Sequence, residues 1–350
     1  MNSSTAICAA KPHSDPHLTD VWFELLTRTA LPAGAVVTKH DIGCDGHPSH
    51  LYLLQTPEYP RQVRGLSNFY SPIYGPTDDA SIDSVKLTAL FKQIRTQNKR
   101  PTTIQLAPLD TDSSFFTAAP KALRDAGWIT DDYFCFGNWF AELAEPRFET
   151  YFSERSSQVR NTVTRARKKL HKDPSFSIAV LTTQGPALEQ AIEDFTAVYN
   201  DSWKKPEPFP TFIPSLCRSA ADMGWLRLGI LKLDGQAVAA QLWLVSSGTA
   251  YIVKLAYRQE YAKRTVGSVL TAHLMQHVID TDSVRTIDYL IGDDSYKRDW
   301  TPLRRERRGI VAFNRSHLRG LAAAAKHFSG RQLKRIRTNR PSDSAPQLTS

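Results

Sequence analysis

The stretch from residue 249 to residue 300 limits the possible folds of this chain more than any other. Thr249 to Tyr257 is rich in β-branched and aromatic residues and has the length of a strand. A short basic loop, residues 262–268, leads into Ser268 to Ile279, where apolar residues recur at helical spacing. Thr286 to Ile291 predicts a second strand, and a polar run follows it. The order strand, tight loop, helix, strand predicts an α/β fold.

The loop in this stretch has the features of an anion site. A glycine-bearing loop that opens a helix brings free backbone N–H groups and the positive end of the helix dipole together. Gly267 lies in such a loop, and Lys263 and Arg264 add two cations. A pyrophosphate would fit there. A glycine that only allows the chain to turn is an equally good interpretation of the loop taken alone.

The stretch resembles the acyl-CoA binding core of the GNAT acetyltransferase superfamily, and more closely its CelD-like, Fem-related branch. The resemblance rests on KLAY at 254–257, RTVGSVL at 264–270 and IDYLIGDDSYKRDW at 287–300. It extends over roughly residues 152–300. The loop keeps only Gly267 of the glycines in the usual Q/R-x-x-G-x-G/A pattern. The resemblance implies a GNAT fold with mixed sheets.

The first half of the chain predicts a lobe of the same kind. Helices over Ser81–Gln97 and Phe115–Ala126 alternate with strands over Thr102–Leu106 and Tyr133–Leu143. No phosphate loop is visible there, so we expect two tandem GNAT-like lobes, of which the first only shapes the cleft. The expected divisions are a flexible lead over 1–20, an N-terminal lobe over 21–148, a C-terminal acyltransferase lobe over 149–330 and a basic, disordered tail over 331–350.

Length and composition fit a soluble protein of two domains. A chain of 350 residues exceeds the usual single core. No apolar run approaches the roughly 20 residues of a membrane helix, and the N-terminus has no apolar region typical of a secretory signal. The scattered cysteines contain no C-x-x-C pair, which fits reduced thiols. We therefore expect a cytoplasmic location and no membrane span. His273 and His277 are spaced as in zinc helices, but no Glu lies between them, and no Cys or carboxylate has a ligand spacing to the loop histidines, so no metal is expected.

Charge is divided unevenly along the chain. Residues 1–150 hold 13 Lys and Arg against 17 Asp and Glu, a net charge of −4, whereas residues 151–350 have a net charge of +13. A basic second half suits a phosphate-rich ligand or a polyanionic acceptor. Arg160 and Arg165, on a predicted helix over Phe152–Lys172, could reach such a group. The alternative is a solvated helix face.

The resemblance implies a donor site. GNAT enzymes hold the pantetheine of CoA like an extra strand beside the splayed end of the strand that here ends at Tyr257. Leu255, Ala256 and Tyr257 would then offer main-chain groups to acetyl-CoA or another acyl-CoA. The pyrophosphate would face the loop residues Lys263, Arg264, Thr265, Val266, Gly267 and Ser268.

The resemblance also implies catalytic roles. Tyr296 would be the general acid, and Lys297 would stabilise the oxyanion or bind a phosphate. Asp288 and Asp294 are candidates for the base or for orienting the amine. The alternative for Asp294 and Lys297 is a surface ion pair at a helix start. The expected substrate-binding residues are Arg160, Arg165, Trp203 and Gln241.

These features favour an N-acyltransferase that moves an acyl group, acetyl in the expected case, from acyl-CoA to an amine. The family suggests an acceptor in polysaccharide or cell-envelope biosynthesis, either a sugar or an envelope precursor. A Fem-like transferase that takes an aminoacyl group from tRNA is one alternative. A GNAT-fold module that binds polyanionic polysaccharide or partner proteins without catalysis is another.

Overall fold

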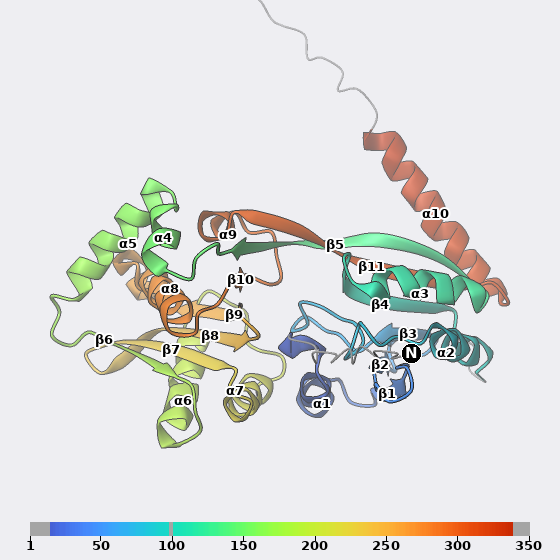
Figure 1. The fold of residues 1–350 in the computed structure, drawn as a ribbon, viewed down its shortest axis with the longest axis horizontal. Helices are drawn as coiled ribbons and strands as arrows, with labels where there is room; N and C mark the ends of the chain where they lie inside the picture. The colour runs from blue at the N-terminus through green and yellow to red at the C-terminus, as the bar shows by residue number, and fades with distance from the viewer. Residues whose placement is uncertain (1–14, 98–100, 339–350) are drawn as a thin grey trace, which may run out of the picture.

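The structure of the protein is a computed structural model that describes residues 15–97 and 101–338 (Figure 1). Its strands are β1 Val36–Asp41, β2 His50–Gln55, β3 Gln62–Gly65, β4 Thr103–Asp110, β5 Trp128–Glu142, β6 Ser177–Leu181, β7 Leu226–Leu233, β8 Gln236–Ser246, β9 Thr249–Tyr257, β10 Thr286–Asp288 and β11 Leu303–Asn314. Its helices are η1 Pro16–Leu18, α1 Asp20–Thr29, α2 Ser84–Thr96, α3 Ser114–Asp125, α4 Phe148–Ser153, α5 Ser157–Leu170, α6 Pro186–Asn200, α7 Phe212–Asp222, η2 Gln259–Arg264, α8 Val266–Gln276, η3 His277–Thr281, α9 Ser295–Trp300 and α10 Leu318–Thr338.

The strands form one mixed sheet, which confirms the expected α/β class. Within the described residues the sheet has 11 strands, in the order β1-β2-β3-β4-β11-β5-β10-β9-β8-β7-β6. The pairs β3/β4 and β9/β10 are parallel, and the other neighbours are antiparallel. The two long strands β5 and β11 run side by side across the molecule (Figure 1).

The sheet does not break at residue 148, where we expected one lobe to end. β11 comes from the C-terminal half but lies between β4 and β5 of the N-terminal half. β5 in turn pairs with β10 of the C-terminal half through Phe140, Ala141 and Glu142. Each half therefore contributes a strand to the hydrogen bonding of the other, and the division into two lobes stays a prediction.

Helices cover both faces of the C-terminal part of the sheet (Figure 1). α5 and α8 pack on one face, where Val163 and Leu274 share a buried cluster with Trp243. α6 and α7 pack on the other face, where Phe195 and Phe212 join a second cluster. Successive residues of a strand point to opposite faces, so β7 and β8 contribute side chains to both clusters.

Several sequence predictions need correction. The lead is not flexible throughout, because η1 is buried at Pro16, His17 and Leu18; residues 1–14 lie outside the described part. The tail is not wholly disordered, because α10 continues to Thr338; residues 339–350 again lie outside it. The predicted helix over Phe152–Lys172 is two helices, α4 and α5.

Candidate functional site

β9 and β10 diverge soon after they meet. They pair only at Thr249–Tyr251 and Thr286–Asp288, although β9 continues to Tyr257. β8 pairs with the other edge of β9 along its whole length. In the part of the chain that the structure describes, no strand pairs with the β10-facing edge of β9 beyond Tyr251. That edge can therefore form hydrogen bonds with an extended ligand.

A cavity of about 500 Å³ lies beside this open edge. It is bounded by the end of β9, the start of α8, the segment around α9, the first turns of α5 and the loop after α6. Nine of the residues predicted for the site line it: Trp203, Gln241, Leu255, Ala256, Tyr257, Gly267, Ser268, Asp294 and Tyr296.

The N-terminus of α8 forms one wall of the cavity. The helix begins at Val266. The preceding residue, Thr265, has a left-handed backbone conformation (φ 61°), and no side chain caps the helix. Its first N–H groups and its dipole are therefore available to an anion. A Cβ atom on Gly267 would lie 2.9 Å from the Tyr257 ring, which explains the glycine by close packing between α8 and β9.

Gln241 fixes this helix to the sheet. Its side-chain nitrogen Nε2 donates hydrogen bonds to the Gly267 carbonyl at 3.0 Å and to the Thr271 hydroxyl at 2.9 Å. Its Oε1 accepts one from the Trp243 indole at 3.1 Å. Because Gln241 makes these three hydrogen bonds and is only 2% exposed, its side chain positions the start of α8.

Tyr296 presents its phenol to the cavity from the first turn of α9. Burial, and then the charge of Asp294, raise the pKa of the Tyr296 phenol to about 12. The phenol therefore keeps its proton at neutral pH and can donate it. Asp294 precedes α9 and also lines the cavity.

Lys297 does not line this cavity, although it was predicted to act beside Tyr296. Its ammonium is buried and donates hydrogen bonds to the carbonyls of Tyr289 (3.4 Å), Ile291 (2.5 Å) and Gly292 (3.3 Å). It also pairs with Asp294 at 3.4 Å. The alternative considered from the sequence, an ion pair of Asp294 and Lys297 at a helix start, is therefore present. Lys297 is buried, however, and is not a surface residue. Its contacts hold the segment that carries Tyr296.

Asp288 is also enclosed by partners. The residue is 2% exposed. Its carboxylate accepts hydrogen bonds from the Asn138 amide at 2.6 Å, the Leu290 N–H at 2.6 Å and the Arg305 guanidinium at 2.5 Å. These bonds join β10 to β5 and β11 and leave no place for an amine substrate, so the geometry does not support the predicted role of Asp288 as a base.

The predicted cationic residues lie outside the cavity lining. Arg264 pairs with Asp173 at 2.9 Å, and Lys263 is exposed on η2. Arg160 and Arg165 lie on the exposed side of α5. Of the remaining loop residues, Thr265 and Val266 do not line the cavity either, and Val266 is buried in the core.

The sequence analysis missed Lys204, which lines the cavity from the loop after α6. Burial, and then the nearby charge of Lys254, lower the pKa of the Lys204 ammonium to about 8. Its Nζ also lies 5.7 Å from the ring centre of Trp203. The available signal was the segment Lys204 to Pro210, whose three prolines mark a stiff loop of the kind that often lines binding sites.

A partly buried ion pair and a tyrosine connect this loop to β9 and to the N-terminal half. Glu207 pairs with Lys254 of β9 at 2.6 Å and accepts a hydrogen bond from the Tyr70 hydroxyl. Tyr70 stacks on Phe212 with 3.9 Å between ring centres. These contacts hold the Lys204 loop between the two halves of the chain, so the cavity wall depends on both.

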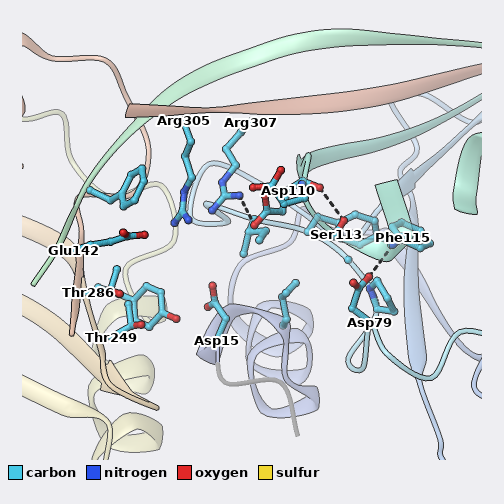
Figure 2. Close-up of a pocket in the computed structure, with 18 residues that line it drawn as sticks. Asp15, Asp79, Asp110, Ser113, Phe115, Glu142, Thr249, Thr286, Arg305 and Arg307 are labelled. Carbon is cyan, nitrogen blue, oxygen red and sulfur yellow. Dashed lines mark hydrogen bonds and ion pairs between the residues drawn. The ribbon is translucent and has the colours of Figure 1, made fainter. Parts of the chain in front are cut away.

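A second cavity of about 360 Å³ lies at the seam of the two halves (Figure 2). Of the charged groups at its wall, Arg307 lies 2.8 Å from Asp110 (Figure 2). Arg305 pairs with Asp288, which does not line this cavity. Asp79 accepts hydrogen bonds from the N–H groups of Ser114 and Phe115. Its lining includes Thr249, at the far end of β9, about 20 Å along the strand from Leu255. It is therefore distinct from the first cavity.

Within residues 15–97 and 101–338, no group of three or more His, Cys, Asp or Glu side chains could hold a metal ion. No helix in the same part of the chain is long and apolar enough to cross a membrane.

Solved structures share this fold at low sequence identity. FemX matches with a TM-score of 0.59 and 11% identity, over 86% of this chain and 93% of FemX. The C-terminal domain of a predicted lysylphosphatidylglycerol synthetase from Agrobacterium fabrum matches with a TM-score of 0.51 and 12% identity, over 82% of this chain and 86% of that domain. L-PGS from Bacillus licheniformis matches with a TM-score of 0.50 and 10% identity, over 89% of this chain and 95% of L-PGS.

A family model matches part of the C-terminal half. No curated protein matches the chain, but residues 157–298 match the family model described as an acetyltransferase (GNAT) domain. The matched segment contains the open edge of β9, the start of α8 and the α9 segment that bound the cavity. The CelD-like assignment stays a prediction. The chain thus has the GNAT fold, and its residues 157–298 match the acetyltransferase (GNAT) domain family.

Proposed function

We propose that the protein is an N-acyltransferase that moves an acyl group from acyl-CoA to an amine. The observation that carries the proposal is the unpaired edge of β9 beside the uncapped N-terminus of α8, both in one cavity. An extended chain that contains amides and ends in a pyrophosphate matches both features. The pantetheine arm of CoA has that form.

The donor would lie along Leu255, Ala256 and Tyr257, with its amides paired to the free main-chain groups of β9. Its pyrophosphate would accept hydrogen bonds from the first N–H groups of α8, around Gly267 and Ser268. The helix dipole stabilises negative charge at that position. This placement brings the thioester toward Tyr296, because all these residues line the same cavity.

The chemical step would then use the groups around the thioester. The amine attacks the carbonyl carbon, a C–N bond forms, and the C–S bond breaks as the tetrahedral intermediate collapses. The Tyr296 phenol gives its proton to the departing thiolate. Lys204, in its neutral form, removes the proton from the attacking nitrogen, directly or through a water molecule.

Calorimetric titration with CoA tests the donor site. Ser268 lies in the first turn of α8, where a carboxylate stabilises the helix by interaction with its dipole. Ser268→Asp should therefore fold at least as well as the parent protein but repel the pyrophosphate, which should weaken CoA binding by about tenfold or more. Gly267→Asp should weaken it too, with added strain against Tyr257.

Ser177→Asp is the matched control, because it adds the same carboxylate at an exposed position of β6, away from the cavity. Its CoA affinity should equal that of the parent. If Ser268→Asp binds CoA as tightly as this control, the donor site is elsewhere. If the parent protein itself binds no CoA or acetyl-CoA, a binding module without catalysis becomes the better interpretation.

A second candidate is transfer of an aminoacyl group from tRNA, because FemX is among the similar structures. The net charge of +13 over residues 151–350 also suits a polyanionic donor. Titration with charged tRNA in place of CoA separates the two donors. For either donor we expect an amine acceptor on a sugar or a cell-envelope precursor, formed in the cytoplasm.

A further inference from the structure

The C-terminal helix α10 has two unlike faces. One face packs against the protein: Ala324 is 5% exposed, and His327 and Arg331 both pair with Asp131 of β5. Gly320 approaches Asn314 so closely that a Cβ atom would lie 2.1 Å from its carbonyl oxygen. Polar and small residues therefore form most of the face of α10 that packs on the sheet, and at its border the Phe328 ring contacts Phe313 with 6.3 Å between ring centres.

A neighbouring side of α10, about 100° around the helix from the packed face, is apolar and exposed to solvent. Leu318, Leu321, Ala325 and Phe328 are spaced by three, four and three residues, which places them on one side of a helix. Leu318 is 83% exposed, Leu321 43% and Phe328 37%. Figure 1 shows the helix extending away from the rest of the molecule. This arrangement is the reverse of an ordinary surface helix, which packs its apolar face inward.

The helix is also strongly basic. The sequence of α10 contains six Lys or Arg and no Asp or Glu. Arg319 and Lys326 are exposed and lie on the opposite flank from Leu321 and Phe328, because each precedes a residue of the packed face by one position, about 100° around the helix. The exposed part of the helix therefore has apolar residues on one side and cations on the other, which matches a surface with anionic groups outside and an apolar interior.

We propose that α10 docks the protein on an anionic phospholipid surface. The helix would lie in the plane of the lipid headgroups, with Leu318, Leu321 and Phe328 inserted and Arg319 and Lys326 among the phosphates. It would lie on the surface without crossing it, in keeping with the lack of any described helix long and apolar enough to span a membrane. The proposal is independent of the acyl donor.

Charge distinguishes this partner from the others that an exposed helix could have. A second copy of α10 would bring two basic helices together with no carboxylate on either to compensate. A nucleic acid would use the cations but would leave the apolar stripe in water. An anionic membrane satisfies both features of the helix at once.

Sedimentation of the full chain with phospholipid vesicles tests the proposal. The probe is a set of vesicles made of phosphatidylcholine alone or of phosphatidylcholine with about a third phosphatidylglycerol. Binding should occur on the anionic vesicles and weaken as salt rises, because salt screens the attraction. Leu321→Gln with Phe328→Gln should lower the partition coefficient by about tenfold or more. Arg319→Gln with Lys326→Gln should lower it by about fivefold for each cation removed.

Matched controls come from α2. Val85 is 75% exposed, and Lys92 is exposed on the same helix. Val85→Gln with Lys92→Gln should bind vesicles as the parent does. Equal binding to neutral and anionic vesicles, or unchanged binding of the α10 variants, would overturn the proposal. So would a dimer that sedimentation velocity detects and that the Leu321 and Phe328 changes abolish.

Discussion

At the scale of single residues, Tyr296 is the group whose removal should affect chemistry alone. We expect Tyr296→Phe to lower turnover by about a hundred- to ten-thousand-fold, the usual value of a general acid, because the thiolate would leave unprotonated. CoA affinity should stay within a few-fold, since the ring and its packing against Tyr289 remain. Thiol release and calorimetry measure the two quantities. Equal turnover in parent and variant would remove Tyr296 from the mechanism.

Lys204 should give the reaction its dependence on pH. Its lowered pKa, about 8, means that the neutral amine becomes the main form as pH rises through that value. The charges that set this pKa include Lys254, Glu207, Lys297 and Asp294. If neutral Lys204 is the base, turnover rises with pH and levels off above about pH 8.

The matched comparison is Lys204→Gln against Lys205→Gln, since Lys205 is the next residue and is exposed. The first change should remove the rise in turnover between about pH 7 and 9, and the second should preserve it. A rise that survives in Lys204→Gln would assign the titration to the amine substrate or to another group.

At the scale of elements, Lys297 stabilises the segment between β10 and α9. Leu290 (φ 54°) and Gly292 (φ 106°) both have left-handed backbone conformations there, and the Lys297 ammonium bonds to the carbonyls around them. Lys297→Met would leave these acceptors without a donor. We expect a loss of about 1–3 kcal/mol in the free energy of unfolding, measured by urea denaturation.

Arg298→Met is the control for this change, because Arg298 is exposed on the same helix. It should leave the free energy of unfolding nearly unchanged. A Lys297→Met protein with parental stability and greatly reduced turnover would instead restore the oxyanion role that the family resemblance implies.

The sequence predicted some elements well because their signals are local. β9 was predicted at its observed bounds. The Asp234–Gly235 pair, a strong signal for a two-residue turn, likewise lies between β7 and β8. β10 was predicted to reach Ile291 but ends at Asp288, because the Asp288 and Lys297 contacts bend the chain. Local propensity cannot show such contacts.

The bounds of β11 were the hardest to predict from the sequence, because residues far away in the chain pair with its first half. In the sequence only Ile310 to Phe313 have the apolar character of a strand, whereas β11 begins at Leu303. The added residues include four arginines, which look like a solvated segment in the sequence. In the structure Arg304, Arg305, Arg307 and Arg308 pair with Asp293, Asp288, Asp110 and Asp132 on neighbouring segments.

The sequence also predicted part of the lining of the candidate site. The donor positions Leu255, Ala256, Tyr257, Gly267 and Ser268 do line one cavity, because a strand, a loop and a helix that follow one another must be close in space. Lys204 was missed because it reaches the cavity from a distant part of the chain. Its lowered pKa depends on Lys254 and on burial, neither of which the sequence near it reveals.

At the scale of the whole molecule, the exchange of strands between the halves should make them fold together. β11 provides the hydrogen-bond partner of both β4 and β5, so residues 15–148 alone would lack the strand between them. Residues 149–338 alone would expose the edge of β10 that β5 covers. Unpaired interior strands of this kind favour aggregation.

We therefore expect the intact chain to unfold in urea in a single transition, and each fragment expressed alone to be aggregated or unfolded. Coexpression of the two fragments should restore a soluble complex, because the missing partners are then present. Circular dichroism and gel filtration measure these outcomes. A cooperative unfolding transition in the isolated fragment 15–148 would show that the N-terminal half folds without β11, and the boundary predicted near residue 148 would then separate two independent lobes.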